Sequence, residues 1–414
     1  MTQSTQIKTV FRPVYEWAEY DSIKGILKPG AGAVRISGCV RSQKTHLAMA
    51  LADGTGKGDV LITVSDEREG RMICSEIEAL GERAVYFPEI DYQFFRVDTK
   101  SKEILRSRTQ VLADLTARRS ESNRVVVVTT IGALMGPVLA PGMITEKLTT
   151  LRTDDEMEIG QLSDRLTACG YTRVPIVESF GEYAIRGGIL DVWPLTEDVP
   201  YRLEWWGDVI DTIRSFDAET QRSIEQKEEV TLFPVMDTDI MAWGVEKAAS
   251  LFSYFAPEKD LIILDEPARL REQAEVIIQK NSETEESLPA EVLRPFAQIA
   301  RLCTVFSLIT LSSLEHQTAG IKSAGSFALE AHPVAGYNRS FEMLTRDLKR
   351  LRKGGVRVVL LSPSETRAKR LAADLRDYEL AAFYDPAQDR EVQNGEVLDN
   401  RDGGERLCLS GTWL

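Results

Sequence analysis

Short runs of β-branched residues alternate along much of the chain with longer amphipathic stretches. Residues 59–64 (Asp-Val-Leu-Ile-Thr-Val) predict a strand, after which Ser65 or Asp66 can accept backbone N–H groups at the start of a helix. Residues 356–361 and 367–378 repeat this pattern, and a helix is predicted before them at 341–351. Such alternation predicts α/β units that pack around a parallel sheet.

The pattern changes between about residues 170 and 217. Residues 189–193, 201–206 and 209–213 are short alternating runs that are separated by turn residues. They predict a compact antiparallel sheet inserted between the α/β units.

The most apolar window of the chain covers residues 125–144. Glycine and proline interrupt it, so only residues 125–130 predict a continuous strand, and we expect no membrane span. The first 20 residues include charged side chains and lack the apolar core of a signal peptide. We therefore expect a cytoplasmic protein without a membrane partner.

Length and charge narrow the possibilities further. A chain of 414 residues that is 43% hydrophobic is expected to form two to four domains. Its formal net charge of −14 repels a polyanion, which favours protein partners over DNA. The 5 cysteines include no C-x-x-C pair and the 3 histidines lie far apart, so we expect a reducing compartment and no metal site.

One segment is similar to a phosphate-binding loop. Gly38, Lys44 and Thr45 stand where that loop needs a glycine, a lysine for the phosphates and a hydroxyl for magnesium. Gln43, however, occupies the place of the second glycine, which normally lets the loop close around phosphate. The alternative is a helix start in which Lys-Thr is incidental, so we predict a degenerate site.

A second segment fits the same interpretation. Residues 261–264 are apolar and are followed by Asp265 and Glu266, as in the strand with which phosphate-loop enzymes hold magnesium. The alternative is a buried strand whose acids cap a helix at 268–279. Together with the eroded loop, we interpret this pair of acids as the remnant of a nucleotide site.

The sequence gives little support for histidine-based catalysis, metal binding or base stacking. The three histidines, His46, His316 and His332, have neither a nucleophile elbow nor metal-ligand spacing near them. The aromatic residues at 92, 94 and 95, with Arg96, could stack on bases, although packing in a core is the simpler role.

The most specific part of the sequence is a set of segments at 170–173, 177–194 and 200–217, followed by Glu219-Thr-Gln-Arg-Ser223. It closely resembles the second domain that UvrB shares with bacterial transcription-repair coupling factors. The Thr-Gln-Arg-Ser run is similar to the coupling-factor version of this junction. The resemblance to the amino-terminal region of that family covers roughly residues 23–397.

The resemblance implies a fold and a domain organisation. It implies an α/β protein with a degenerate phosphate-loop (RecA-like) domain, an inserted small sheet domain and a third, smaller α/β domain. The implied boundaries are 1–134 and 219–330 for the first domain, 135–218 for the insert, 331–398 for the third domain, and 399–414 for an aberrant tail.

The resemblance also implies partners and site residues. In the family the inserted domain docks UvrA, so the candidates for contact, or for holding the contact loops, are Arg173, Glu182, Tyr183, Arg186 and Arg202. The full-length family also binds RNA polymerase and double-stranded DNA through a motor that would follow this region. The resemblance thus implies a non-catalytic adaptor of transcription-coupled nucleotide-excision repair that recruits UvrA and restrains the motor.

The sequence departs from the family after residue 398, where the tail is typical of a frameshift or an early stop. Two other interpretations therefore stay open. One is a UvrB-like, ATP-dependent protein that binds damaged DNA through Lys44, Thr45, Asp265 and Glu266. The other is a truncated fragment without a role. No cofactor is expected, and ATP would bind only if the eroded site still works.

Overall fold

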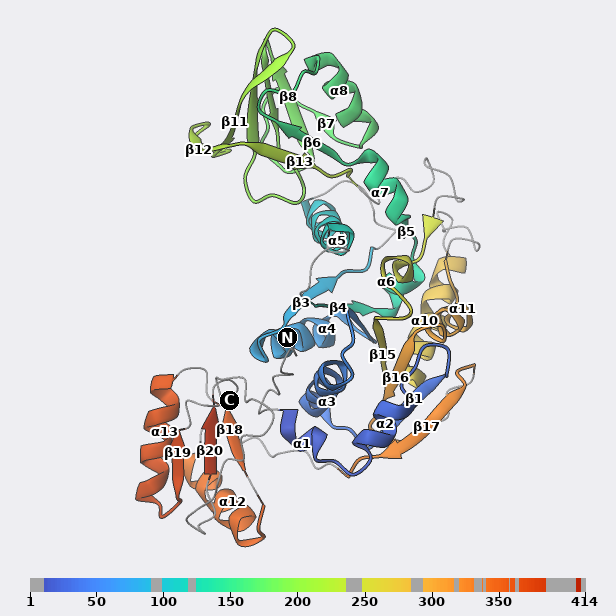
Figure 1. Ribbon diagram of the computed structural model, residues 1–414, viewed down its shortest axis with the longest axis vertical. Coiled ribbons are helices and arrows are strands. Elements are labelled where there is room, and N and C mark those ends of the chain that lie inside the picture. Colours follow the sequence, from blue (N-terminus) through green and yellow to red (C-terminus); the bar gives the residue numbers. More distant parts are fainter. Residues whose placement is uncertain are drawn as a thin grey trace, which may run out of the picture. The chain divides into compact units, whose positions relative to one another are not determined.

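The computed structural model describes residues 11–90, 99–117, 124–235, 248–283, 293–315, 320–330, 337, 340–356, 358–361, 365–384 and 407–410 (Figure 1). The chain divides into two compact units. One comprises residues 1–24, 40–56 and 330–414, and the other comprises residues 25–39 and 57–329.

A seven-stranded parallel sheet forms the centre of the second unit, in the order β17-β1-β16-β15-β2-β4-β3. Its strands are β1 (Ala33–Ser37), β2 (Val60–Val64), β3 (Arg83–Phe87), β4 (Val125–Thr130), β15 (Leu261–Asp265), β16 (Ser307–Leu311) and β17 (Ser323–Ala328). A strand that is buried on both faces has a continuous run of apolar residues in its sequence. Every residue of β2, β4, β15 and β16 is buried. The predicted α/β class with a parallel, RecA-like sheet is confirmed.

Helices of this unit follow the predicted pattern. The predicted helix after β2 is α4 (Glu67–Ala79), and the Asp66 side chain caps it by accepting a hydrogen bond from the Glu69 amide at 2.9 Å. Among its described residues, the other helical segments are α5 (Thr99–Ala117), α6 (Ile131–Met135), α7 (Pro141–Lys147), α8 (Ile159–Ala168), the 3-10 helix η4 (Leu251–Tyr254), α10 (Pro267–Ser282) and α11 (Phe296–Cys303). The short strands β5 (Val138–Leu139) and β14 (Ala248–Ala249) pair with each other.

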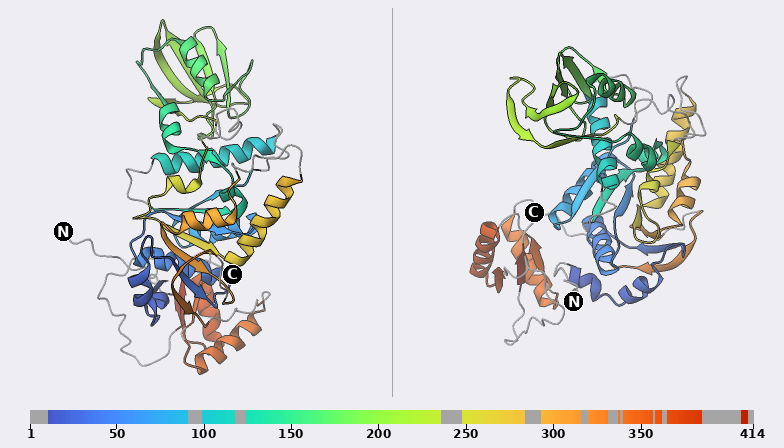
Figure 2. Two further views of the ribbon diagram at one scale, coloured as in Figure 1. Left: turned by 90° about the vertical axis from the view of Figure 1, so that its right-hand side faces the viewer. Right: turned by 45° about the horizontal axis from the view of Figure 1, so that its top comes forward.

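A six-stranded mixed sheet forms the inserted domain, in the order β12-β11-β10-β9-β8-β7 (Figure 2, green). Its strands are β7 (Thr172–Arg173), β8 (Glu182–Arg186), β9 (Ile189–Val192), β10 (Tyr201–Trp206), β11 (Val209–Phe216) and β12 (Ser223–Lys227). The three runs predicted as antiparallel strands are β9, β10 and the start of β11, so that prediction is confirmed.

The boundaries 135–218 given for this domain stay a prediction. Two strands that follow residue 218 belong to the inserted sheets: β12 pairs with β11, and β13 (Glu229–Leu232) pairs with β6 (Thr149–Arg152). Before residue 149, by contrast, α6 and β5 contribute to the core of the parallel-sheet domain.

Helix α5 contributes to both cores of the second unit. Val111, Leu112 and Leu115 pack in the core of the parallel-sheet domain, whereas Leu105 packs in the core of the inserted domain. Between them, the buried Arg108 donates hydrogen bonds to the carbonyls of Pro88 (2.8 Å) and Pro137 (3.3 Å). The helix therefore ties the two domains together through side chains.

The first unit contains α1 (Arg12–Tyr15), most of α2 (Tyr20–Ile26) and α3 (Arg41–Gly54), together with the carboxyl-terminal module. That module comprises α12 (Phe341–Lys353), β18 (Val359–Leu361), α13 (Glu365–Asp377), β19 (Ala382–Tyr384) and β20 (Leu407–Ser410). The predicted helix–strand–helix order is confirmed. Part of the predicted tail takes a strand position, because β20 lies between β18 and β19 and is parallel to both.

Several predictions concern residues outside the described part of the chain. These are the aromatic cluster at 92–95 with Arg96, and His316 and His332. Within the described part, no group of three His, Cys, Asp or Glu residues could hold a metal ion. No helix among the described residues is long and apolar enough to cross a membrane.

Candidate partner-binding site

The two faces of the inserted sheet differ in character. Side chains of a strand alternate between faces, so Tyr201 and Leu203 of β10 enter a buried core together with Leu162 and Leu166 of α8. Arg202 and Glu204 therefore lie on the opposite face, which we call the outer face. The cross-strand partners of Arg202 are Asp191 on β9 and Arg214 on β11, so these residues share it.

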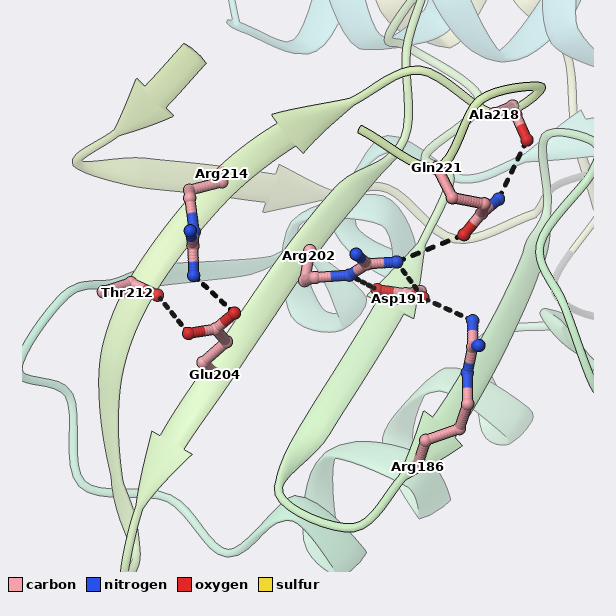
Figure 3. A network of polar contacts seen from close by, with 8 residues as sticks. All are labelled: Arg186, Asp191, Arg202, Glu204, Thr212, Arg214, Ala218 and Gln221. Carbon is pink, nitrogen blue, oxygen red and sulfur yellow. Dashed lines mark hydrogen bonds and ion pairs between the residues drawn. The ribbon is translucent and has the colours of Figure 1, made fainter. Parts of the chain in front are cut away.

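Asp191 is the hub of a polar network on the outer face (Figure 3). Arg202 binds it with both arms of the guanidinium, Nε to Oδ1 at 2.6 Å and Nη2 to Oδ2 at 2.9 Å. Arg186 adds a bond from Nη2 to Oδ2 at 3.0 Å. Only 2% of the Asp191 side chain is exposed, so two arginines neutralise a buried carboxylate.

The loop after β11 completes the network. Gln221 accepts a hydrogen bond from Arg202 Nη2 on its Oε1 at 3.2 Å and donates from Nε2 to the Ala218 carbonyl at 2.8 Å (Figure 3). The hydrogen bonds to Asp191 raise the pKa of the Arg202 guanidinium. Arg202 is therefore held in one position and stays charged.

The two arginines differ in how much they present to a partner. The side chain of Arg202 is 19% exposed, whereas that of Arg186 is 50% exposed. A second pair, Glu204 with Arg214, lies beside them, and the Thr212 hydroxyl donates to Glu204 at 3.3 Å (Figure 3). Arg186 is thus the member of the network that a partner can reach, and Arg202 supports it.

The other predicted site residues lie outside this network. Glu182 accepts from Lys102 Nζ at 2.9 Å and from the backbone amides of Glu178 and Ser179, so it orders the loop before β8. Tyr183 is buried, and its hydroxyl lies 2.9 Å from that of Thr167, so it can hold the loops but not touch a partner.

Arg173 is exposed on the edge strand β7. Among the described residues its side chain makes no hydrogen bond or ion pair. The structure thus joins Arg186 and Arg202, while Arg173, Glu182 and Tyr183 stay separate predictions.

Sequence reasoning missed Asp191 and Gln221. Asp191 stands in an apolar run, Ile-Leu-Asp-Val, where alternation alone would have placed it on the face opposite Leu190. That signal could have identified an acid on the outer face, beside apolar neighbours, that needs a cation. Gln221 follows a turn, and no local pattern marks it.

The predicted nucleotide remnant is divided between the two units. In the first unit Lys44 and Thr45 are buried on α3, and the Val40 amide donates to the Gln43 Oε1 at 3.3 Å. Gln43, which replaces the loop glycine, therefore accepts a hydrogen bond from a backbone N–H near the start of the helix.

In the second unit, other segments of the chain contact the remaining residues of the predicted nucleotide site. Gly38 has φ +79°, and the Leu329 carbonyl oxygen lies 1.9 Å from where a Cβ would stand, so only glycine fits. Asp265 is buried at the end of β15. Glu266 accepts from the Ser313 amide at 2.8 Å and the Ser313 hydroxyl at 2.6 Å. Of the alternative, the buried strand is present as β15, but the side chain of Glu266, which occupies the N-cap position of α10, makes no capping hydrogen bond.

Comparison with known proteins identifies the inserted domain first. Residues 149–237, which span β6 to β13, match the model of the UvrB interaction domain. The chain is therefore a protein that carries a UvrB interaction domain beside a parallel, RecA-like α/β core.

The wider comparison then points to one family of repair proteins. The chain is 23% identical to the transcription-repair-coupling factor of Bacillus subtilis (strain 168), over 93% of this chain and 38% of the relative. It is 29% identical to that of Haemophilus influenzae, over 54% of this chain and 18% of the relative. The corresponding factor of Escherichia coli (strain K12) is 28% identical over 43% of this chain. The resemblance to the amino-terminal region of transcription-repair-coupling factors is confirmed, and the chain spans less than two fifths of these relatives.

Proposed function

We propose that this chain is a non-catalytic adaptor of transcription-coupled nucleotide-excision repair and that it docks UvrA through the outer face of its inserted sheet. The carrying observation is the UvrB interaction domain at 149–237, whose outer face presents Arg186 from the Asp191 network. Its similarity to transcription-repair-coupling factors supports the repair context.

The Asp191 network suits docking for a physical reason. A guanidinium offers a planar, permanently charged fork that can bind a partner carboxylate. An arginine on a mobile side chain loses rotamer freedom on binding, but Arg186 is already held by one bond to Asp191. Half of its side chain is exposed, so a UvrA carboxylate can add a second contact.

The absence of ATP chemistry is part of the same proposal. Gln43 accepts the Val40 N–H, and the Leu329 carbonyl lies against Gly38. Phosphate binding needs loop N–H groups that point at the ligand and room for its oxygens. Both features support a site that binds no nucleotide, so Lys44, Thr45, Asp265 and Glu266 have structural roles in this proposal.

In a longer protein, the adaptor would work beside other domains. The relatives are more than twice as long as the matched region. We propose that this part brings UvrA to stalled RNA polymerase and restrains the DNA motor, whose domains would lie outside the chain. The formal charge of −14 fits a protein that reaches DNA through its partners.

A titration against purified UvrA tests the proposal. We expect saturable binding by the unchanged chain and about tenfold weaker binding by Arg186→Ala, because interface arginines often contribute above 1 kcal/mol. Arg152→Ala is the matched control, since Arg152 is also exposed in this domain but pairs with Glu229 outside the network. ATP binding and damaged-DNA binding are measured in parallel. Clear ATP-dependent DNA binding without UvrA binding would favour the UvrB-like alternative, and no binding in any arm would favour a fragment without a role.

A further inference from the structure

Trp206 is the most exposed large hydrophobic residue in the described part of the chain, at 83%. It lies at the end of β10 opposite Val209, and the turn between the two strands contains Gly207 with φ +63°. A single exposed apolar residue is common on protein surfaces and carries no meaning alone. Its surroundings decide whether it can act as a contact.

The hairpin tip that carries Trp206 is held in place by a neighbouring segment. The Ile210 amide donates to the Asp155 carbonyl at 3.0 Å, and the Met157 amide donates to the Asp208 carbonyl at 2.8 Å. The indole Nε1 of the preceding Trp205 donates to the Met157 carbonyl at 2.8 Å. The tip therefore needs little ordering when it binds, which favours affinity.

The hairpin tip and the segment beside it carry charge of one sign. Segments 154–158 and 206–211 lie side by side through these hydrogen bonds, and they contain no lysine or arginine. Their acidic residues are Asp154, Asp155, Glu156, Glu158, Asp208 and Asp211. A negative rim repels nucleic acid and attracts a protein surface rich in lysine or arginine.

Trp206 also shares the outer face with the arginine network. Residues 202, 204 and 206 alternate along β10 with residues that face the core. The bulge in this strand pair lies on β11, where Asp211 has no partner on β10, so the alternation of β10 is not interrupted. Four residues of strand place Trp206 about 13 Å from Arg202 along the sheet. A standard interface covers about 800 Å² per partner and spans both.

We infer that Trp206 is the apolar anchor of the UvrA-docking surface and enters an apolar pocket on UvrA that is rimmed by basic residues. This inference rests on the proposed function. Tryptophan in a desolvated pocket is the residue type that most often dominates binding energy, and surrounding polar contacts exclude water from it. The arginine network then supplies orientation, and Trp206 supplies most of the affinity.

The test compares variants in titrations against UvrA. We expect Trp206→Ala to weaken binding about 30-fold, which corresponds to about 2 kcal/mol, and Trp206→Phe to weaken it less. Leu314→Ala is the matched control, since Leu314 is 67% exposed on the parallel-sheet domain. Asp208→Lys should weaken binding by reversing a rim charge. Thermal melting verifies that each variant is folded. Because Trp206 is exposed, its replacement should not unfold the protein.

The outcomes separate the inference from the function on which it rests. If Arg186→Ala weakens binding while Trp206→Ala stays within twofold of the unchanged chain, the anchor is refuted and the UvrA-docking function stands. If the unchanged chain does not bind UvrA, both are refuted. Stronger binding by Asp208→Lys would show that the partner surface is acidic and would also overturn the inference.

Discussion

Two polar regions of the second unit use similar residues in different ways. At the carboxyl end of β15, Glu266 accepts both hydrogen bonds that Ser313 can donate, and nearby in the sheet the Leu329 carbonyl lies against Gly38. On the outer face of the inserted sheet, Asp191 is more deeply buried than Glu266, but one of its two arginines remains half exposed.

The two regions differ in what provides the final hydrogen-bond partner of the polar side chains, either the chain itself or, in the proposed function, a bound protein. In the parallel-sheet region another segment of the same chain supplies it, so the polar groups hold loops together. On the inserted sheet the carboxylate positions Arg186, whose side chain is half exposed. A region of the first kind should respond to mutation in stability alone, and a region of the second kind in stability and binding together.

The largest expected effect follows from removing the hub. Asp191→Ala leaves the Arg202 guanidinium, largely buried, without its carboxylate, and we expect a loss of about 3 kcal/mol in the free energy of unfolding. UvrA binding should fall at least as far as in Arg186→Ala. Urea unfolding and titration measure the two effects. Asp211→Ala, at the exposed bulge of β11, is the control for stability, and an unchanged midpoint in Asp191→Ala would contradict the role of the hub.

A pH effect of similar or smaller size is expected in the parallel-sheet region. Asp260 accepts from the amides of Asp59 (2.9 Å) and Ala256 (2.6 Å), and burial raises the pKa of its carboxyl from 3.8 to about 6. Because the folded state then binds the proton more tightly than the unfolded state, stability should rise as pH falls from 7 through 6 towards 4, by about 3 kcal/mol at most.

The Asp260 effect is measured as the difference between the unchanged chain and Asp260→Asn in urea unfolding at several pH values. As pH falls, the free energy of unfolding of the unchanged chain should increase relative to that of the variant. The ratio of their UvrA affinities should stay constant. A difference that is flat between pH 7 and 4 would exclude a raised pKa at this position.

The smallest effect separates the two regions most clearly. Glu266→Ala removes the acceptor for the Ser313 amide and hydroxyl, which should cost about 1–2 kcal/mol in the free energy of unfolding. Glu266→Gln keeps an acceptor oxygen and should cost less. Neither should change UvrA affinity by more than about twofold, since Glu266 lies in the parallel-sheet domain. A large drop in affinity would mean that the two regions are coupled.

Much of the fold could be predicted because the signals are local. Continuous apolar runs predicted buried strands such as β2 and β4, alternation predicted β9 and β10, and Asp66 marked the start of α4. Each of these depends on the chemistry of a few neighbouring residues. The candidate site was predicted only in part: Arg186 and Arg202 proved to be neighbours, and their shared carboxylate was missed.

The sequence by itself determined the order and type of the elements, the acidic balance, and the resemblance that pointed to the inserted domain. Only the tertiary structure decided that Asp191 joins Arg186 to Arg202, that Tyr183 points into the core, and that Glu266 binds Ser313 across the sheet rather than capping its own helix. These contacts depend on strand register and on the packing of segments far apart in the chain, which residue-by-residue propensities do not encode.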